Sequence, residues 1–273
     1  MTATVTEFEQ QWAEWRSERD RWARQPLGWL SLTGLHWLGE AGETFDGLPG
    51  TWRADGENVH VTVESEPRPG EGELWFDGRV LSGTTTLTPG EGQPGLEVTT
   101  GQRVIEVIRR SGQFALRIHD PVAPTLASFT EIPAYQADPR WVVTGRFEPY
   151  EVARVVTTGA VVDGLVHHHP ATGTVTFRLG EAEHRFIVFG SHTTGLHVLF
   201  TDATSGVTTY GGARRLDLPR PGADGAVVLD FNRAANLPCA FTDYATCPVA
   251  PAENRLPLAV EAGERDPRKE FTA

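Results

Sequence analysis

Two arginines near the carboxyl terminus are of the right type for binding chemistry. Arg233 follows Asn232 and Arg255 follows Asn254, within a segment from residue 230 to 264 that is otherwise acidic and apolar. Arginine is rarely buried without a bidentate partner, and its guanidinium group matches carboxylate and phosphate. One interpretation is an internal network, in which these arginines pair with nearby carboxylates: Asp230, Glu253, Glu261 or Glu264. The other is a clamp on the carboxylate or phosphate of a small ligand, and the two interpretations are compatible.

The ligand hypothesis predicts which side chains would surround a small polar or anionic molecule. Arg233 and Arg255 would bind the ligand together with Asn236 and Asn254. Residues from earlier in the chain would line the opposite side of the pocket. The full predicted set is Arg117, Asp202, Tyr210, Arg214, Arg233, Asn236, Cys239, Glu253, Asn254, Arg255 and Glu264. If a reaction occurs, we expect acid–base chemistry from Asp202, Glu253 or Glu264. The sequence leaves open whether the protein is an enzyme.

The sequence predicts no metal site and no cofactor. Cys239 and Cys247 lack a histidine in their segment and the two further ligands that zinc needs, so we expect buried reduced thiols. A catalytic Cys239 is the alternative. The run from His167 to His169 lies on a predicted strand, where neighbouring side chains point to opposite faces, and no third ligand flanks it. Residues 90–95 match G-x-G-x-x-G, but a proline and a following strand exclude the dinucleotide motif.

The carboxy-terminal segment is expected to be an ordered loop. Four prolines exclude both a regular helix and a central strand: Pro238, Pro248, Pro251 and Pro257. Apolar side chains along the segment, such as Phe231 and Leu256, gain free energy from burial. We therefore predict a fixed conformation that lies against the body of the protein, where loops of this kind often carry function.

The amino-terminal residues 5–24 are predicted to form an amphipathic helix that ends before Pro26. Large side chains recur every three or four residues and share one face: Phe8, Trp12, Trp15, Arg19 and Trp22. Packing across a sheet is the simplest interpretation. The alternative function of the protein is a non-catalytic interaction module, in which Trp12, Trp15 and Trp22 bind a partner or a second copy of the chain.

The remaining pattern indicates an all-β fold. Short alternating runs such as residues 58–63, 73–76 and 104–108 are separated by turn signals, and Asp77-Gly78 is a hairpin turn. We predict three parts: a helix in residues 1–27, a small β-sandwich in residues 28–118, and an antiparallel barrel-like domain in residues 119–273. The proline-rich segment would close one mouth or edge of the barrel.

The same carboxy-terminal residues carry a resemblance to a known family. The run DFNRA-x-N-x-PCAFT-x-YATCP-x-x-P-x-ENRL, followed by EAGE, resembles the signature of the domain-of-unknown-function 1684 family. Further similar stretches are residues 28–35, 117–121, 200–206 and 209–214. The resemblance implies a fold and a residue pattern, and it implies no reaction.

Composition limits the class of partner and the compartment. The formal net charge is -12 and the sequence pI is about 5.2, so nucleic acid and anionic membranes are poor partners. Hydrophobic residues make up 39% of the chain, which is ample for a core. The first residues lack the features of a signal peptide, and the two cysteines without an export signal favour a cytoplasmic protein.

Overall fold

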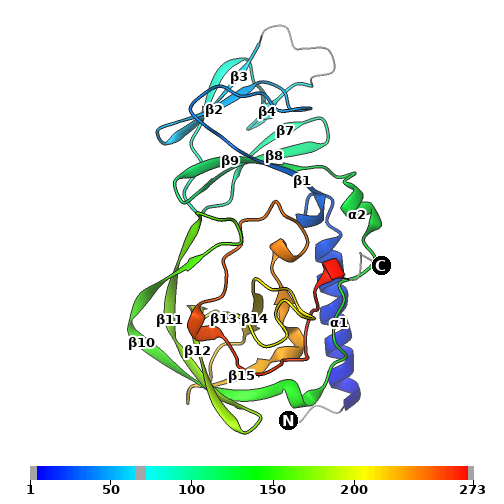
Figure 1. The fold of residues 1–273 in the computed structure, drawn as a ribbon, viewed down its shortest axis with the longest axis vertical. Coiled ribbons are helices and arrows are strands. Elements are labelled where there is room, and N and C mark those ends of the chain that lie inside the picture. The colour runs from blue at the N-terminus through cyan, green and yellow to red at the C-terminus, as the bar shows by residue number, and fades with distance from the viewer. Residues whose placement is uncertain (1–4, 65–71, 270–273) are drawn as a thin grey trace. The chain divides into compact units, whose positions relative to one another are not determined.

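The computed structural model describes residues 5–64 and 72–269, which form a mostly β structure with one amino-terminal helix and three antiparallel sheets (Figure 1). The chain divides into two compact units. One comprises Met1–Trp22 and Thr130–Ala273, and the other comprises Ala23–Phe129. The predicted all-β class is therefore confirmed. The three predicted domain ranges, residues 1–27, 28–118 and 119–273, stay a prediction.

The unit Ala23–Phe129 contains two sheets that share one apolar core. The six-stranded sheet has the order β1 (Leu32–Trp37), β9 (Gln113–His119), β8 (Arg103–Arg110), β7 (Leu96–Thr100), β4 (Trp75–Phe76) and β5 (Arg79–Val80). The smaller sheet has the order β2 (Thr51–Asp55), β3 (Asn58–Val63) and β6 (Gly83–Leu87). Trp52 and Val59 from the smaller sheet and Ile105 and Leu116 from the larger belong to the same buried cluster. The two sheets of this unit therefore share one core, and the β-sandwich stays a prediction.

The predicted hairpin turn in this unit is present. Asp77 and Gly78 connect β4 to β5, with φ angles of 50° and 71°. Two successive residues with positive φ suit the twist of a tight antiparallel hairpin, and Asp-Gly tolerates this conformation well. Two short helices, η1 (Trp29–Ser31) and α2 (Pro124–Ser128), lie before the first strand and after the last.

The other unit is built on a seven-stranded antiparallel sheet. Its order is β15 (Ala226–Asp230), β10 (Val142–Gly159), β11 (Val166–Leu179), β12 (Ala182–Ser191), β13 (Gly195–Phe200), β14 (Arg214–Leu218) and β16 (Ala235–Asn236). Alternate side chains of β11, β12 and β13 face inward and bury an aromatic cluster that includes Phe177, Phe186 and Phe200. Phe231, which follows β15, packs against all three rings.

This sheet is not a closed barrel in the described residues, so the barrel-like prediction is unconfirmed. β15 and β16 are the two outer strands, and they pair with β10 and β14 rather than with each other. The chain between them turns through the short helix η3 (Phe231–Arg233), which Asp230 caps by accepting a hydrogen bond from the Asn232 backbone. Phe231, the first residue of this turn, is fully buried in the core of the unit.

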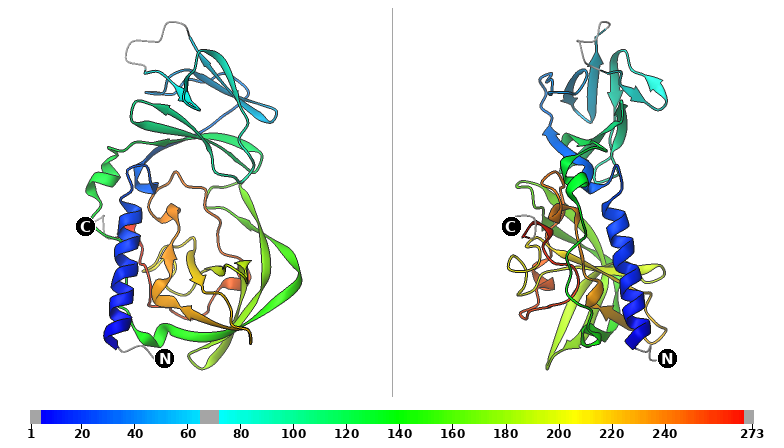
Figure 2. Two further views of the ribbon diagram at one scale, coloured as in Figure 1. Left: turned by 180° about the vertical axis from the view of Figure 1, so that it is seen from behind. Right: turned by 90° about the vertical axis from the view of Figure 1, so that its right-hand side faces the viewer.

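The predicted amino-terminal helix is present as α1 (Val5–Ala23) and packs on its own unit. The indole nitrogen of Trp12 donates to the Asn232 carbonyl oxygen at 3.3 Å. The Trp22 ring meets the Phe241 ring edge-on at 6.0 Å. The two views of Figure 2 show the helix beside the carboxy-terminal residues. Within residues 5–64 and 72–269, no helix has the length and apolar character needed to cross a bilayer.

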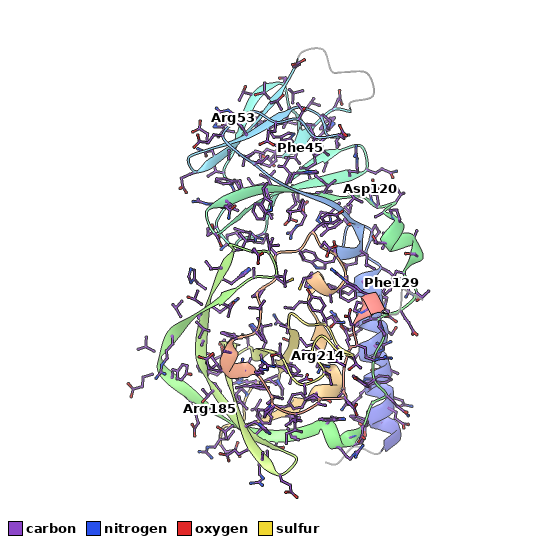
Figure 3. The ribbon with its side chains drawn as sticks, viewed as in Figure 1. Phe45, Arg53, Asp120, Phe129, Arg185 and Arg214 are labelled. Carbon is purple, nitrogen blue, oxygen red and sulfur yellow. The ribbon has the colours of Figure 1, made fainter. Side chains whose placement is uncertain are left out.

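The carboxy-terminal segment is ordered and contributes to the core. Its helical parts are single turns, namely η4 (Pro238–Ala240), η5 (Ala252–Asn254) and η6 (Pro267–Lys269). Leu256 and Val260 join the aromatic core. The fully buried Arg214 donates through Nη1 to the Ala262 carbonyl oxygen and through Nη2 to that of Val260 (Figure 3). The backbone of the segment therefore lies against a charged group inside the unit.

Candidate functional site

A groove of about 560 Å³ lies between α1, β14 and the start of the carboxy-terminal segment. Helix α1 contributes Trp15, Arg19 and Trp22, and β14 contributes Arg215 and Asp217. The carboxy-terminal wall runs from Arg233 to Pro238 and includes Asn236. We call this pocket the α1 groove. It brings together two of the predicted ligand residues, Arg233 and Asn236.

The back of the α1 groove is a buried ion pair between Arg19 and Glu264. Arg19 donates to the Glu264 carboxylate through Nε at 2.6 Å and through Nη2 at 3.1 Å. The Asn236 backbone N–H donates to the same carboxylate at 2.6 Å, so Glu264, whose side chain is fully buried, has three hydrogen bonds. The Arg19 guanidinium also lies over the Trp22 ring, 4.3 Å from its centroid. Arg19 and Glu264 therefore bind each other and hold α1 against the carboxy-terminal segment, so neither is available to a ligand.

The other two arginines of the α1 groove are more exposed and more loosely paired. Arg215 contacts Asp217 at 2.7 Å, with 42% of the arginine side chain exposed. Arg233 contacts Asp230 at 3.2 Å with 40% exposed, and its Nε makes no hydrogen bond with the described residues. Ion pairs this exposed contribute about 0–1 kcal/mol, so little free energy is lost when a ligand anion replaces the carboxylate.

The side-chain oxygen of Asn236 is also free to accept a hydrogen bond at the groove. Its side chain is almost fully buried, and Nδ2 donates to the Arg265 carbonyl oxygen at 2.8 Å. Its Oδ1 accepts no hydrogen bond from any described residue. A buried acceptor without a donor is uncommon in folded proteins and calls for a partner such as water or a ligand.

Asp202 and Arg214, which were predicted to face a ligand, instead face each other inside the core. Nη2 of Arg214 lies 2.6 Å from Oδ2 of Asp202, and both side chains are buried. Asp202 also accepts from the backbone N–H and the hydroxyl of Thr204, at 2.6 and 2.5 Å. Burial lowers the pKa of Arg214, and the adjacent Asp202 opposes that shift. This pair organises the carboxy-terminal segment from within.

Glu253, Asn254 and Arg255, three of the predicted ligand residues, differ in burial. Glu253 and Asn254 belong to the helical turn η5, and the chain becomes extended at Arg255, where its backbone pairs with Thr201. Asn254 points inward, where Oδ1 accepts from the Ile187 N–H and Nδ2 donates to the carbonyl oxygens of Ile187 and Leu199. Glu253 and Arg255 are exposed. The expected pair of enclosed tail arginines is therefore reduced to Arg233.

Tyr210 and Cys239 form a separate cluster with Cys247. Both cysteines are reduced and buried, as expected from the sequence, and the Cys239 N–H lies 3.3 Å from Cys247 Sγ. A hydrogen bond from Cys247 lowers the pKa of Cys239, while burial opposes this effect. Burial and the neighbouring Cys239 raise the pKa of Tyr210. The described residues contain no group of three metal-ligating side chains, here or at His167 and His169.

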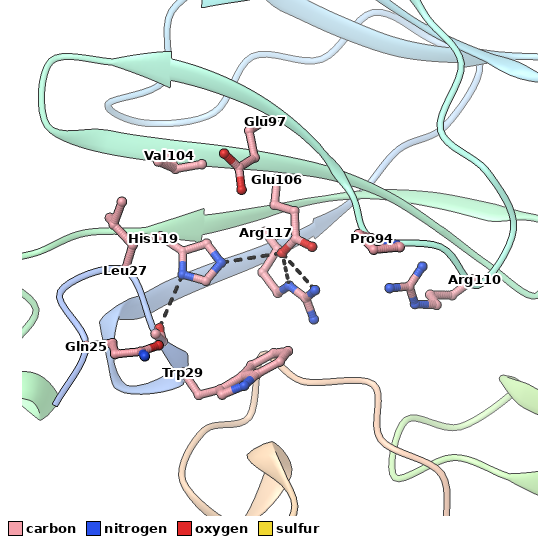
Figure 4. Close-up of a pocket in the computed structure, with 11 residues that line it drawn as sticks. Gln25, Leu27, Trp29, Pro94, Glu97, Val104, Glu106, Arg110, Arg117 and His119 are labelled. Carbon is pink, nitrogen blue, oxygen red and sulfur yellow. Dashed lines mark hydrogen bonds and ion pairs between the residues drawn. The ribbon is translucent and has the colours of Figure 1, made fainter. Parts of the chain in front are cut away.

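Arg215, Trp15 and Trp22 line the α1 groove but were not among the predicted ligand residues. The Trp15 and Trp22 stripe was predicted to pack, and only the fold shows that one edge of it stays half-buried beside a pocket. The remaining predicted residue, Arg117, lies on β9 in the other unit and lines a different pocket (Figure 4).

Residues 127–265 match the family model described as a protein of unknown function, DUF1684. The chain belongs to the DUF1684 family. A solution NMR structure of an uncharacterized protein of Haloarcula marismortui is similar to this DUF1684 chain, with 29% sequence identity and a TM-score of 0.44. The match covers 54% of this chain and 82% of that one. No curated protein matches the sequence. Of the α1 groove, the β14 and carboxy-terminal walls fall inside the DUF1684 match, and the helix wall lies before it.

Proposed function

We propose that this DUF1684 protein binds a small polar or anionic molecule in the α1 groove. The observation that carries the proposal is the convergence of Arg215, Arg233 and Asn236 with two tryptophans in one pocket of about 560 Å³. The pocket is of the size that proteins use for small molecules, which is on the order of 300–1,000 Å³. The carboxy-terminal segment forms one wall, as the sequence hypothesis requires.

The side chains of the groove favour a planar ligand with a negatively charged group. Trp15 and Trp22 supply aromatic surface to the groove, and contact with such surface adds to the free energy of burial. Arg215 and Arg233 can exchange their exposed carboxylate partners for a ligand anion. The Oδ1 atom of Asn236 can accept a hydrogen bond from the ligand after a small side-chain movement.

The proposal is for binding, and it assigns no reaction. Asp202 and Glu264, two of the carboxylates considered for acid–base chemistry, are saturated by hydrogen-bond donors. Glu253 is exposed on the outer side of the segment. Asp217 is the carboxylate that lines the groove, and it faces Arg215.

The interaction-module alternative has less support. It required the tryptophan face of the helix to be available to a partner, but Trp12 and Trp22 both contact the carboxy-terminal residues of the same chain. Residues on the outer side of α1, such as Glu14 and Arg21, are polar and exposed. We therefore put forward no second function.

Calorimetric titration with phenyl phosphate, benzoate and the neutral benzamide tests the proposal. We expect the two anions to bind more tightly than benzamide. Arg233→Gln and Arg215→Gln should each weaken anion binding about tenfold or more, because each removes a charged hydrogen-bond donor. Arg185→Gln, which changes an exposed arginine of β12 outside the groove, should have no effect. Equal affinities in all three variants, or no binding of either anion, would contradict the proposal.

A further inference from the structure

The unit Ala23–Phe129 holds a second charged pocket, which we call the Arg117 pocket. It has a volume of about 420 Å³ and lies where β8 and β9 face the chain before β1 (Figure 4). Its lining includes two arginines, Arg110 and Arg117, together with Glu106, His119 and Trp29. These residues precede the region that matches the family model.

Arg117 is fixed in the pocket by a buried network. Its Nε and Nη2 each lie 2.7 Å from Oε2 of Glu106, and its guanidinium lies over the Trp29 ring at 4.8 Å. Glu106 also accepts from the Gly95 N–H at 3.2 Å and lies 3.4 Å from Nε2 of His119. Burial raises the pKa of Glu106, but His119 and Arg117 outweigh this effect and lower it to about 2. Glu106 is thus an anion at neutral pH, and the charge of Arg117 is matched.

Arg110, unlike Arg117, is not paired with a carboxylate in the pocket. Its Nη1 donates to the carbonyl oxygens of Gln93 and Arg109, at 3.0 and 2.7 Å. Within residues 5–64 and 72–269 it forms no ion pair with a carboxylate. Burial lowers the pKa of Arg110, and the nearby positive charge of Arg117 lowers it further, although Glu106 and Glu91 partly offset this. A bound anion would offset both the desolvation cost of the Arg110 charge and its repulsion from Arg117.

We propose that the Arg117 pocket binds the carboxylate of a small organic acid, with Arg110 as the main charged contact. The apolar body of the ligand would lie against Trp29 and Val104, which supply aromatic and aliphatic surface. Nη1 of Arg117, which makes no hydrogen bond with the described residues, is a second donor to the ligand. The carboxylates of Glu106 and Glu97 also line the pocket. Because they offset the charges of Arg110 and Arg117, the pocket has no excess positive charge to hold the second negative charge of a phosphate monoester, and we expect it to select a monocarboxylate.

A hydrolytic function for the same pocket is not supported, although three residues there have suitable types. Oγ of Ser31 lies 2.9 Å from Nδ1 of His119, and Nε2 of His119 faces Glu106. This is the composition of a serine hydrolase triad. However, the Ser31 side chain is fully buried, and its hydroxyl donates to the Gly28 carbonyl oxygen at 2.6 Å. Ser31 therefore cannot reach a ligand in the pocket, and it orients His119 instead.

Titration of the full chain with benzoate, monitored through the indole N–H signals of its tryptophans by NMR, tests this proposal. The Trp29 signal, assigned with Trp29→Phe, should shift on addition of benzoate. It should shift much less with the neutral benzamide and with phenyl phosphate. Because the readout is Trp29, the result is separate from binding in the α1 groove, which would shift Trp15 and Trp22.

Paired variants give the quantitative test. Arg110→Gln should weaken benzoate binding at this site about tenfold or more, because the arginine provides the unmatched charge. Arg79→Gln, at an exposed arginine of β5 in the same unit, is the control and should leave the affinity unchanged. An unshifted Trp29 signal, equal shifts with benzamide, or full affinity in the correctly folded Arg110→Gln variant would each overturn the proposal.

Discussion

Arg19 and Glu264, 245 positions apart in the sequence, form a buried two-pronged ion pair that joins the amino-terminal helix to the carboxy-terminal segment. The pair fixes the face of α1 that carries Trp15 and Trp22 against the segment that carries Arg233 and Asn236. The walls of the α1 groove are thereby brought together from both ends of the chain.

The first prediction concerns this ion pair. Glu264→Ala should lower the free energy of unfolding by about 3–5 kcal/mol, because it removes the carboxylate that pairs with Arg19 and leaves Nε of Arg19 and the Asn236 N–H without an acceptor. Glu261→Ala changes an exposed glutamate three residues away and should cost less than about 0.5 kcal/mol. Urea denaturation followed by circular dichroism measures both. A small effect at Glu264 would mean that the pair does not hold the helix in place.

The second prediction concerns Asn254, whose amide bridges β12 and β13. Its Nδ2 donates to two carbonyl oxygens, so Asn254→Asp would place a negative charge against two acceptors. We expect a loss of about 3 kcal/mol or more in unfolding free energy. Asn58→Asp is the matched control, since Oδ1 of Asn58 accepts from the Thr88 hydroxyl and a carboxylate does the same. Similar losses for both substitutions would refute the proposed role of the amide.

The third prediction concerns pH. Burial, with help from the charge of Arg215, lowers the pKa of His197 from 6.5 to about 4. The unfolded chain therefore takes up a proton between pH 6.5 and 4 that the folded chain does not. Stability from the neutral ring is present above 6.5 and is lost as the pH falls toward 4. The loss is on the order of 2 kcal/mol after allowance for partial exposure.

The variant that isolates this effect is His197→Phe, which keeps a ring and removes the titration. Its unfolding free energy should fall less steeply than that of the wild type between pH 6.5 and 4. Phe189→Leu, which removes the neighbouring ring 5.7 Å away, should keep the wild-type pH dependence. If His197→Phe retains the full slope, other groups are responsible for it.

Features that depend on local pattern could be predicted from the sequence. The helix follows from large side chains repeating every three or four residues, and the strands of the first half follow from alternation between turn signals. The ordered tail was also predictable, because prolines exclude regular structure while residues such as Leu256 require burial.

Features that depend on contacts between distant residues could not be predicted. Asn254 and Arg255 are adjacent polar residues that the sequence does not distinguish, but the Asn254 amide is buried against Ile187 and Leu199 while Arg255 is exposed. Arg214 was expected to face a ligand, but its partners are Asp202 and carbonyl oxygens of the carboxy-terminal segment, and only the fold brings these together. Closure of the barrel stays unconfirmed, since β15 and β16 are the outer strands of the sheet and do not pair with each other in the described residues.

An NMR titration of the full chain with phenyl phosphate tests most directly whether the α1 groove binds an anion. The indole N–H signals of Trp15 and Trp22 are followed after assignment with Trp→Phe variants. We expect both signals to shift with the same saturation curve and Arg233→Gln to move this curve to about tenfold higher ligand concentration. Unchanged Trp15 and Trp22 signals, or a curve that Arg233→Gln leaves in place, would contradict a ligand site in the α1 groove.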